Sequence, residues 1–310
     1  MHNSPKLETL TKNISKSLSL RECMLKEMNI LAIGAHPDDI ELGCGGVLLK
    51  SINEGHNVYA YTLTRGSASG DPEKRCEELI YSANYMGLNT LWIDNFPDAK
   101  LSLNSDLINH IEYFIRKSNA DVVFTHSLLD FHHDHRAVAS STLEAGRYIS
   151  NILTYEISIT KDFNPQVFFD ISDVIEDKIH LLNVFLSQRG KSFLAADAIK
   201  GLAQYRAYQS RLPQNVTHVE AFEVIKMGLQ SNFSLIQSNS SLAVPVRQNV
   251  STDHLKSTTI EIITNNNDLI NYTDIIEYNP PYTIEKKVIN NLNPTNFEQN
   301  IPINFEQEVN

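Results

Sequence analysis

The stretch NILAIGAHPDDIELGCGG, residues 29–46, joins an apolar run to a polar turn and then to a series of small residues. The apolar run at 29–35 has the length and composition of a buried β-strand. Directly after it come a histidine, a proline and two adjacent aspartates, Asp38 and Asp39. Neighbouring carboxylates repel each other, so this turn predicts a positively charged partner at the end of the strand.

On both sides of this stretch, apolar runs of strand length alternate with segments of helical periodicity. The alternation predicts an α/β fold, a Rossmann-like and mostly parallel sheet with helices on both faces. Ligands in such sheets bind at the carboxyl ends of the strands. Beyond 29–35, the expected strands are 57–64, 90–96, 121–126, 151–158 and 218–227, and the expected helices are 45–56, 72–86, 105–118, 135–149, 171–188 and 192–211.

Changes in amino-acid composition along the chain predict three parts. Residues 1–28 are polar and interrupted by charges, which indicates an N-terminal lead-in. Residues 29–228 contain the α/β pattern. In residues 229–310, asparagine, serine and threonine dominate, so we expect an accessory extension with small strands at 258–264 and 274–289 and a flexible tail.

Charge and cysteine content exclude several classes of protein. The 310 residues carry a net charge of −11, which argues against nucleic acid or an anionic membrane as a partner. The three scattered cysteines include no CxxC pair, so they indicate neither a disulfide framework nor a cysteine-rich zinc site. No segment reaches the ~20 apolar residues of a membrane span. We therefore expect a soluble, cytoplasmic protein.

Two polar segments, each directly after an expected strand, contain the residue types of a metal site. In the first, His36 and Asp39 are three residues apart, with Pro37 stiffening the turn. The second, DFHHDHRAV at 130–138, supplies three histidines among carboxylates where a helix begins. If the two preceding strands are parallel, both loops open on one edge of the sheet. Two histidines and one carboxylate would then bind a divalent metal and leave a position open for water.

The paired aspartates fit such a site because they can divide its chemistry between them. Asp39 would ligate the cation, and Asp38 beside it would act as general base on the water. A histidine of the second segment would stabilise the developing oxyanion and donate a proton. A simpler interpretation is a pair of aspartates capping a helix, but capping explains neither His36 nor the second segment.

Other features also have simpler interpretations. Arg75 and Glu78 lie one turn apart and can pair on a helix surface. The glycines of the first segment lack the spacing of a dinucleotide fingerprint and indicate close packing of a helix on a strand. His126 ends an expected strand and could lean into the site.

Together the two segments resemble the motifs of the LmbE/PIG-L family of zinc-dependent N-deacetylases. The match rests on AHPDDIELGCGG at 35–46 and H-x-D-H-R-A-V at 132–138 and covers roughly residues 29–227. Further matches are TRGSASG at 64–70, R-x-x-E at 75–78 with Met86-Gly87 ending that helix, FPDAKL at 96–101 and HVEAF at 218–222. The family removes acetyl groups from N-acetylglucosamine-type sugars and their conjugates. The resemblance therefore implies a metal-dependent amide hydrolase with an N-acetylated amino sugar as its substrate.

The family pattern implies a role for each matching residue of the metal site. His36, Asp39 and His135 would ligate Zn²⁺. Asp38 would be the general base, and His132 would stabilise the tetrahedral intermediate.

The same pattern implies supporting residues. Asp134 would orient the histidines from behind, and Arg65 would contact the substrate. Asp98 would either contact the substrate or cap a turn. The family often has proline where this chain has His133. The pattern therefore leaves open which of His132 and His133 faces the site, although the spacing favours His132.

Other functions are compatible with the same residues. Two histidines and one carboxylate also suit ferrous iron, so a non-haem iron oxygenase is an alternative. An amidase of a sugar-thiol conjugate and a non-catalytic carbohydrate-binding protein are further alternatives. Oligomers are common in the family, so we expect a homo-oligomer.

Overall fold

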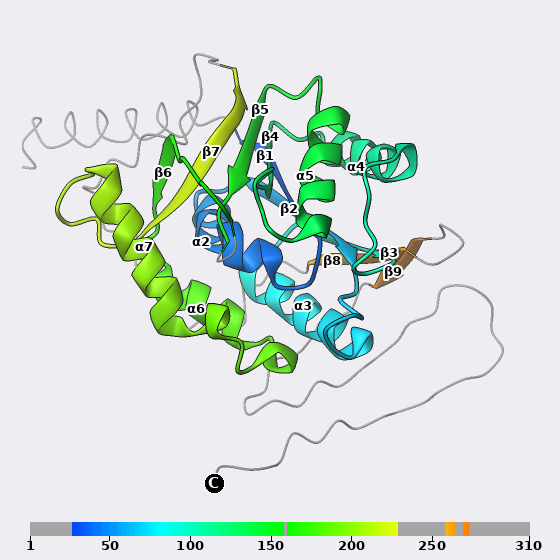
Figure 1. Cartoon of the computed structure of the whole chain (residues 1–310), viewed down its shortest axis with the longest axis horizontal. Helices are drawn as coiled ribbons and strands as arrows, with labels where there is room; N and C mark the ends of the chain where they lie inside the picture. The colour runs from blue at the N-terminus through cyan, green and yellow to red at the C-terminus, as the bar shows by residue number, and fades with distance from the viewer. Residues whose placement is uncertain (1–26, 158–159, 229–257, 264–268, 273–310) are drawn as a thin grey trace, which may run out of the picture.

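One sheet of nine strands runs through the described part of the chain, residues 27–157, 160–228, 258–263 and 269–272 of the computed structural model (Figure 1). The strand order is β6-β7-β5-β4-β1-β2-β3-β8-β9. The six strands from β5 to β8 pair in parallel, and the outer strands β7, β6 and β9 pair antiparallel. The predicted Rossmann-like α/β class, with a mostly parallel sheet, is confirmed.

The bounds of the elements follow the expected alternation closely. The strands are β1 Asn29–Gly34, β2 Asn57–Thr64, β3 Thr90–Phe96, β4 Val122–His126, β5 Asn151–Tyr155, β6 Val167–Asp170, β7 Val219–Met227, β8 Thr259–Ile263 and β9 Leu269–Tyr272. The helices are α2 Asp39–Asn53, α3 Pro72–Met86, α4 Ser105–Lys117, α5 His133–Ala145, α6 Ile175–Asn183 and α7 Ala196–Ser210. Within the described residues, no helix combines the length and apolar character needed to cross a bilayer.

Two hydrophobic cores cover the two faces of the sheet. Successive residues of β1 alternate between them: Ile30 and Ala32 belong to one core, and Leu31 and Ile33 to the other. The first core is completed by α2, α3, α6 and α7, and the second by α4 and α5. The helices therefore bury both faces of the parallel strands, which leaves the strand ends as the open edge of the domain.

The clearest differences from the expected elements concern α2, α6 and β6. Helix α2 begins at Asp39, six residues before the expected start, because the polar turn itself forms its first turn. Helix α6 spans Ile175–Asn183, within the expected 171–188. Strand β6 was not expected, because it is short and none of its residues is fully buried.

The part of residues 229–310 that the structure describes adds to the main sheet. Strand β8 pairs in parallel with β3, and β9 pairs antiparallel with β8. The Trp92 indole donates to Glu261 of β8 over 2.8 Å, which fixes the added strand against β3. The strand expected near 258–264 is therefore present, while the one expected at 274–289 lies outside the described residues.

The small residues of the first segment let α2 lie close to the sheet. A Cβ atom at Gly43 would come within 2.2 Å of the Tyr155 ring on β5. The Tyr155 hydroxyl in turn donates to the carbonyl of Ile33 on β1. Close packing of this helix, expected from its glycines, is what the structure shows.

Candidate functional site

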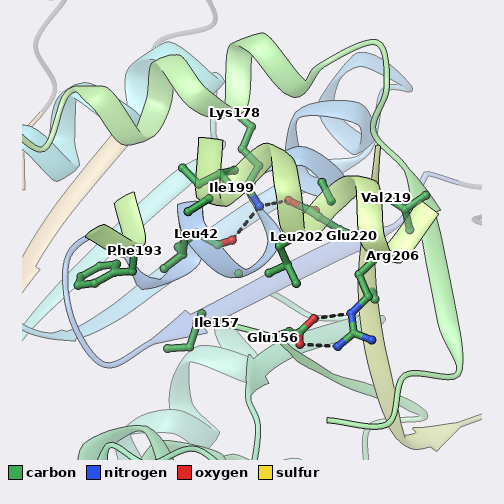
Figure 2. Close-up of a pocket in the computed structure, with 14 residues that line it drawn as sticks. Leu42, Glu156, Ile157, Lys178, Phe193, Ile199, Leu202, Arg206, Val219 and Glu220 are labelled. Atoms are coloured by element: carbon green, nitrogen blue, oxygen red, sulfur yellow. Dashed lines mark hydrogen bonds and ion pairs between the residues drawn. The ribbon is translucent and has the colours of Figure 1, made fainter. Parts of the chain in front are cut away.

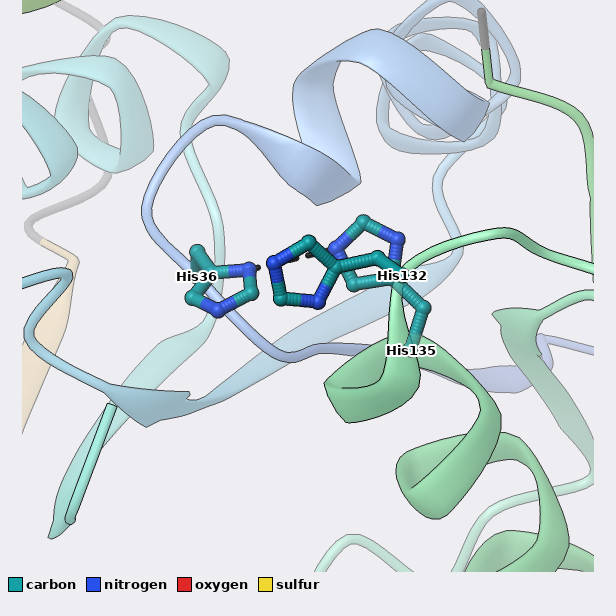
Figure 3. A group of neighbouring side chains, drawn as sticks. All are labelled: His36, His132 and His135. Atoms are coloured by element: carbon teal, nitrogen blue, oxygen red, sulfur yellow. Dashed lines mark hydrogen bonds between the residues drawn. The ribbon is translucent and has the colours of Figure 1, made fainter. Parts of the chain in front are cut away.

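The loops that follow β1 and β4 meet at one edge of the sheet. The two strands are adjacent and parallel, so their carboxyl ends point the same way. The turn after β1 supplies His36 and Asp39, and the start of α5 supplies His132 and His135. Figure 3 shows the three histidine rings turned toward one another between the two loops. The topology therefore brings together residues almost a hundred positions apart.

Three acceptor atoms converge in this cluster. His36 Nδ1 lies 3.2 Å from Asp39 Oδ2 and 3.2 Å from His135 Nε2. Asp39 Oδ2 lies 3.4 Å from His135 Nε2. A tetrahedral zinc ion with ligands at about 2.0–2.1 Å separates its ligands by about 3.3–3.4 Å. The residues present therefore fit a divalent cation of this size.

His36 is oriented by carboxylates behind it. Its Nε2 lies 3.0 Å from Asp98 Oδ1 and 3.2 Å from Asp134 Oδ2. Asp134 is fully buried and is itself fixed by the amides of Ala99 and Leu101 at 2.8 and 2.9 Å. A proton held on Nε2 by these carboxylates leaves the Nδ1 lone pair free for a metal, as in other histidine–metal sites.

His135 is oriented in the same manner by Asp130. Its Nδ1 lies 3.2 Å from Asp130 Oδ1, which also accepts a hydrogen bond from the amide of His132 at 2.7 Å. Burial lowers the pKa of His135, but the charges of Asp39 and Asp130 outweigh it and raise the pKa to about 9. The carboxylates thus favour positive charge at this point, which a bound cation would supply in place of the proton.

Asp38 sits beside the cluster without belonging to it. It occupies the N-cap position of α2 with φ of 104°, but its side chain makes no capping hydrogen bond. Capping alone therefore does not explain this aspartate. Burial, followed by the charge of Asp39, raises the pKa of Asp38 to about 7, while Arg75 and His36 act in the opposite direction. A carboxylate with this pKa can accept a proton near neutral pH.

Arg75 is a site residue that the sequence interpretation placed on the surface. It is buried, and its guanidinium lies 3.3 Å from Asp38 Oδ2 and donates to the Pro37 carbonyl at 2.6 Å. It also donates to the Gly66 carbonyl at 3.0 Å. Glu78 instead accepts from the Ser187 amide at 2.7 Å, so the expected Arg75–Glu78 surface pair is wrong.

The two candidate histidines stack on each other, with ring centroids 5.2 Å apart, but they differ in their other contacts. The His132 ring lies 4.9 Å from the His36 ring and 4.6 Å from the His135 ring, centroid to centroid. The His133 side chain is 53% exposed, and its Nε2 contacts the Ala99 carbonyl at 2.9 Å. His132 is therefore the histidine that the structure brings into the cluster.

His126, at the end of β4, also enters the cluster. It is fully buried, and its Nε2 accepts from the Ala35 amide at 3.0 Å and lies 3.3 Å from Asp39 Oδ2. Its ring stacks on that of His135 with centroids 4.0 Å apart. Burial and then the charge of His135 lower its pKa to about 4, so it is a neutral imidazole. Asp39, His126 and His135 form a second group with metal-ligand spacing.

The two residues expected to contact substrate lie in different places. Asp98 reaches the cluster through His36 and accepts from the Ala68 amide at 2.6 Å. Arg65 lies against the added strand, where it donates to the Ile263 carbonyl at 3.4 Å and faces Glu73 at 3.8 Å. A substrate-binding role for Arg65 stays a prediction.

An α/β sheet with a histidine–carboxylate cluster at the ends of β1 and β4 is the arrangement of an α/β protein with a candidate metal site. The family described as "PIG-L: GlcNAc-PI de-N-acetylase" matches residues 31–146. The chain is 36% identical over 156 residues to the uncharacterized deacetylase YaiS of Escherichia coli K12, a match covering 48% of this chain and 84% of YaiS.

Two further likenesses support the same assignment. The diacetylchitobiose deacetylase of Thermococcus kodakarensis is 28% identical over 185 residues, covering 51% of this chain and 69% of that protein. The crystal structure of the conserved protein TT1542 from Thermus thermophilus superposes with a TM-score of 0.60 and 25% identity, covering 67% of this chain and 99% of that one. The chain belongs to the PIG-L family, and it is an amide-hydrolysing enzyme of the deacetylase type.

Proposed function

We propose that this enzyme is a zinc-dependent deacetylase that removes the N-acetyl group from an N-acetylglucosamine-type sugar or sugar conjugate. The observation that carries the proposal is the convergence of three acceptor atoms, 3.2–3.4 Å apart, beside a buried carboxyl that is not one of them. Zn²⁺ held by His36, Asp39 and His135 would lower the pKa of a water molecule and polarise the amide carbonyl.

Asp38 would then carry the proton, and His132 would stabilise the charge that develops on the substrate oxygen. Asp38 takes a proton from the water as the water oxygen attacks the acetyl carbon. The Nδ1 of His132 accepts from the Asp134 amide at 3.2 Å, so the proton of a neutral His132 lies on Nε2. Burial, with the charges of His135 and His36, lowers the pKa of His132 and keeps the ring neutral. Nε2–H is then the donor that stabilises the developing oxyanion.

The remaining steps restore the starting protonation. The C–N bond would break as the proton taken by Asp38 passes to the leaving amine nitrogen. The second water proton would leave with the products, acetate and the protonated amino sugar. Arg75 keeps Asp38 in place during this cycle through its contacts with Asp38 and the Pro37 carbonyl.

The substrate class is supported by the relatives. The family description names a GlcNAc-containing substrate, and the Thermococcus relative is a diacetylchitobiose deacetylase. We propose that Asp98, which lies 3.0 Å from His36, also contacts the substrate. Action in the cytoplasm and assembly into a homo-oligomer stay predictions.

The test replaces Asp38 by asparagine, which keeps the size of the side chain and removes the base. We expect acetate release from N-acetylated sugars to fall by about 10²–10⁴-fold, as for loss of a general base. Zinc content should stay at one ion per chain. Asp71→Asn is the matched control, because Asp71 is an exposed helix cap and asparagine also caps.

Three results would contradict the proposal. Unchanged turnover in Asp38→Asn would exclude the assigned base. Metal analysis of protein purified without added metal that finds iron, with oxygen uptake and no acetate, would favour the oxygenase alternative. Zinc-loaded protein that binds N-acetylated sugars but releases no acetate would support the non-catalytic alternative.

A further inference from the structure

His133, the first residue of α5, links that helix to the loop that follows β3. Its Nε2 lies 2.9 Å from the carbonyl oxygen of Ala99 and 3.0 Å from Asp134 Oδ1. A carbonyl oxygen and a carboxylate only accept hydrogen bonds, so the proton of a neutral His133 ring lies on Nε2, between these two acceptors. One imidazole therefore joins the start of a helix to a loop 34 positions earlier in the chain.

The backbone of Ala99 has a conformation that needs support from its surroundings. Its φ is 59°, in the left-handed region that a residue with a Cβ atom seldom adopts. In this conformation the Ala99 amide donates to Asp134 Oδ2 at 2.8 Å, while the Ala99 carbonyl accepts from His133. Strained backbone persists only where neighbouring groups fix it. Here the first two residues of α5 fix both backbone polar groups of Ala99.

The same loop determines where the carboxylates behind His36 lie. Asp98, the residue before Ala99, lies 3.0 Å from His36 Nε2. Asp134, which accepts from the Ala99 amide, lies 3.2 Å from the same nitrogen. A change at His133 can therefore reach His36 through both carboxylates, although His133 itself is not one of the three converging residues.

A second contact of His133 is with the neighbouring ring of His132. The two rings stack with an interplanar angle of 11°. Because the His133 side chain is 53% exposed, it contributes little to the hydrophobic core. His133 could thus act through its hydrogen bonds or through ring packing, and the two roles predict different responses to substitution.

We propose that His133 is a positioning residue of the metal site, which holds Asp98 and Asp134 behind His36 through its hydrogen bond to the Ala99 carbonyl. This inference rests on the proposed function, in which His36 is a metal ligand. The family pattern often has proline at this position, and a proline side chain has no hydrogen-bond donor. The link between α5 and the loop after β3 is therefore a feature of this chain and not of the family pattern.

Two substitutions separate the hydrogen bond from the ring contact. His133→Gln keeps a side-chain N–H donor and removes the ring, whereas His133→Phe keeps a ring and removes the donor. Zinc affinity, measured by competition with a chelator, should fall about ten-fold in His133→Phe and stay near the wild-type value in His133→Gln, as for an outer partner of a metal-binding histidine. His180→Phe is the matched control, since His180 is a partly buried histidine whose ring packs on Tyr85 outside the cluster.

A measurement on the zinc-free protein tests the link without the metal. The amides of Ala99 and Leu101 both donate to Asp134. Their hydrogen exchange should be about ten-fold faster in His133→Phe than in wild type and His133→Gln, because the loop opens more often once the link is lost.

These measurements distinguish failure of this inference from failure of the proposed function. Equal exchange rates, or equal zinc affinity, in wild type and His133→Phe would overturn the inference. So would an equal loss in His133→Gln, which would assign the effect to the ring, or a second zinc ion that wild type binds and His133→Phe does not, which would make His133 a ligand. Zinc-loaded wild type that releases no acetate from N-acetylated sugars would instead refute the proposed function and leave the positioning role to the exchange rates and zinc affinities.

Discussion

Two groups of buried charged residues that pack on helix α2 differ in how their charge is satisfied. Near the middle of the helix, Lys178 donates to Glu220 at 2.5 Å and to the Leu42 carbonyl at 2.7 Å (Figure 2). Glu220 also accepts from the amides of Gly46 and Val47, both at 2.8 Å. In this group, which we call the closed pair, each acceptor has a hydrogen-bond donor and the two charges compensate each other.

At the N-terminal end of the same helix, the acceptors face one another instead. Asp39 Oδ2 and the ring nitrogens of His36 and His135 converge at 3.2–3.4 Å, and the pKa values of both histidines are raised even though burial opposes the rise. Buried charge alone therefore does not mark a functional site. The converging acceptors at the end of the helix are, by contrast, the arrangement of a candidate cation site.

A cavity that Lys178 and Glu220 help to line also contains buried charges that are fully paired. It measures about 220 Å³, lies between α2, α7 and β7, and is lined largely by apolar side chains such as Phe193 and Leu202. Its charged residues are paired, Lys178 with Glu220 and Arg206 with Glu156. The charged residues of this cavity are thus compensated by partners within it, unlike the converging acceptors of the histidine cluster.

The largest effect on stability should come from breaking the ion pair between Lys178 and Glu220. Lys178→Met leaves the Glu220 carboxylate buried without its charged partner, so we expect a loss of about 3–5 kcal/mol in the free energy of unfolding. Lys178→Met combined with Glu220→Gln removes both charges and should recover part of that loss. Urea unfolding of the three proteins measures the difference. A double variant no more stable than the single one would show that the stranded charge is not the cause.

A smaller effect is expected from the carboxylate behind His135. Asp130→Asn keeps an acceptor for the His132 amide but removes the charge that orients His135. We expect zinc affinity, measured by competition with a chelator, to fall about 10–100-fold, as for other second-sphere partners of metal histidines. Asp94→Asn, in a buried carboxylate away from the cluster, is the control. Equal affinity in wild type and Asp130→Asn would mean that His135 is positioned by packing alone.

Contacts of the site that follow from the order of parallel strands could be predicted from the sequence. Apolar periodicity places β1 and β4, and parallel strands necessarily bring their following loops to one edge. The grouping of His36, Asp39 and His135 could therefore be expected before any coordinates. The early start of α2 could not, because it depends on Asp38 adopting a positive φ, which local propensity disfavours.

Contacts between distant side chains were the part that the sequence did not reveal. The spacing of Arg75 and Glu78 is equally typical of a surface ion pair, and only the packing of α3 against the first segment directs Arg75 to Asp38. Asp130 stood in the quoted second segment, two residues before His132, and its proximity to a metal histidine was the available signal. The pairing of β8 with β3 had no local signal, because it joins residues about 170 positions apart.

The smallest effect concerns a third charged group, the partly buried His110 with its neighbours Asp94 and Asp106. His110 Nδ1 lies 3.0 Å from Asp94 Oδ2, which also accepts from the Tyr61 hydroxyl at 2.7 Å, and Asp106 lies 3.7 Å from Nε2. The hydrogen bond to Asp94 raises the pKa of His110, partly offset by burial, and the charges of Asp94 and Asp106 add to the rise. The group thus binds a proton more tightly in the folded than in the unfolded protein.

The sign of the pH dependence follows from that difference. A raised pKa contributes stability that is fully present below the unfolded value of about 6.5 and is lost as the pH rises through the folded pKa. His110→Gln should therefore cost about 1 kcal/mol of unfolding free energy at pH 5.5 and less at pH 9. Urea unfolding at both pH values measures it. The pH dependence of the cost should vanish in an Asp94→Asn background, and a cost that is the same at both pH values in the wild-type background would assign His110 a packing role only.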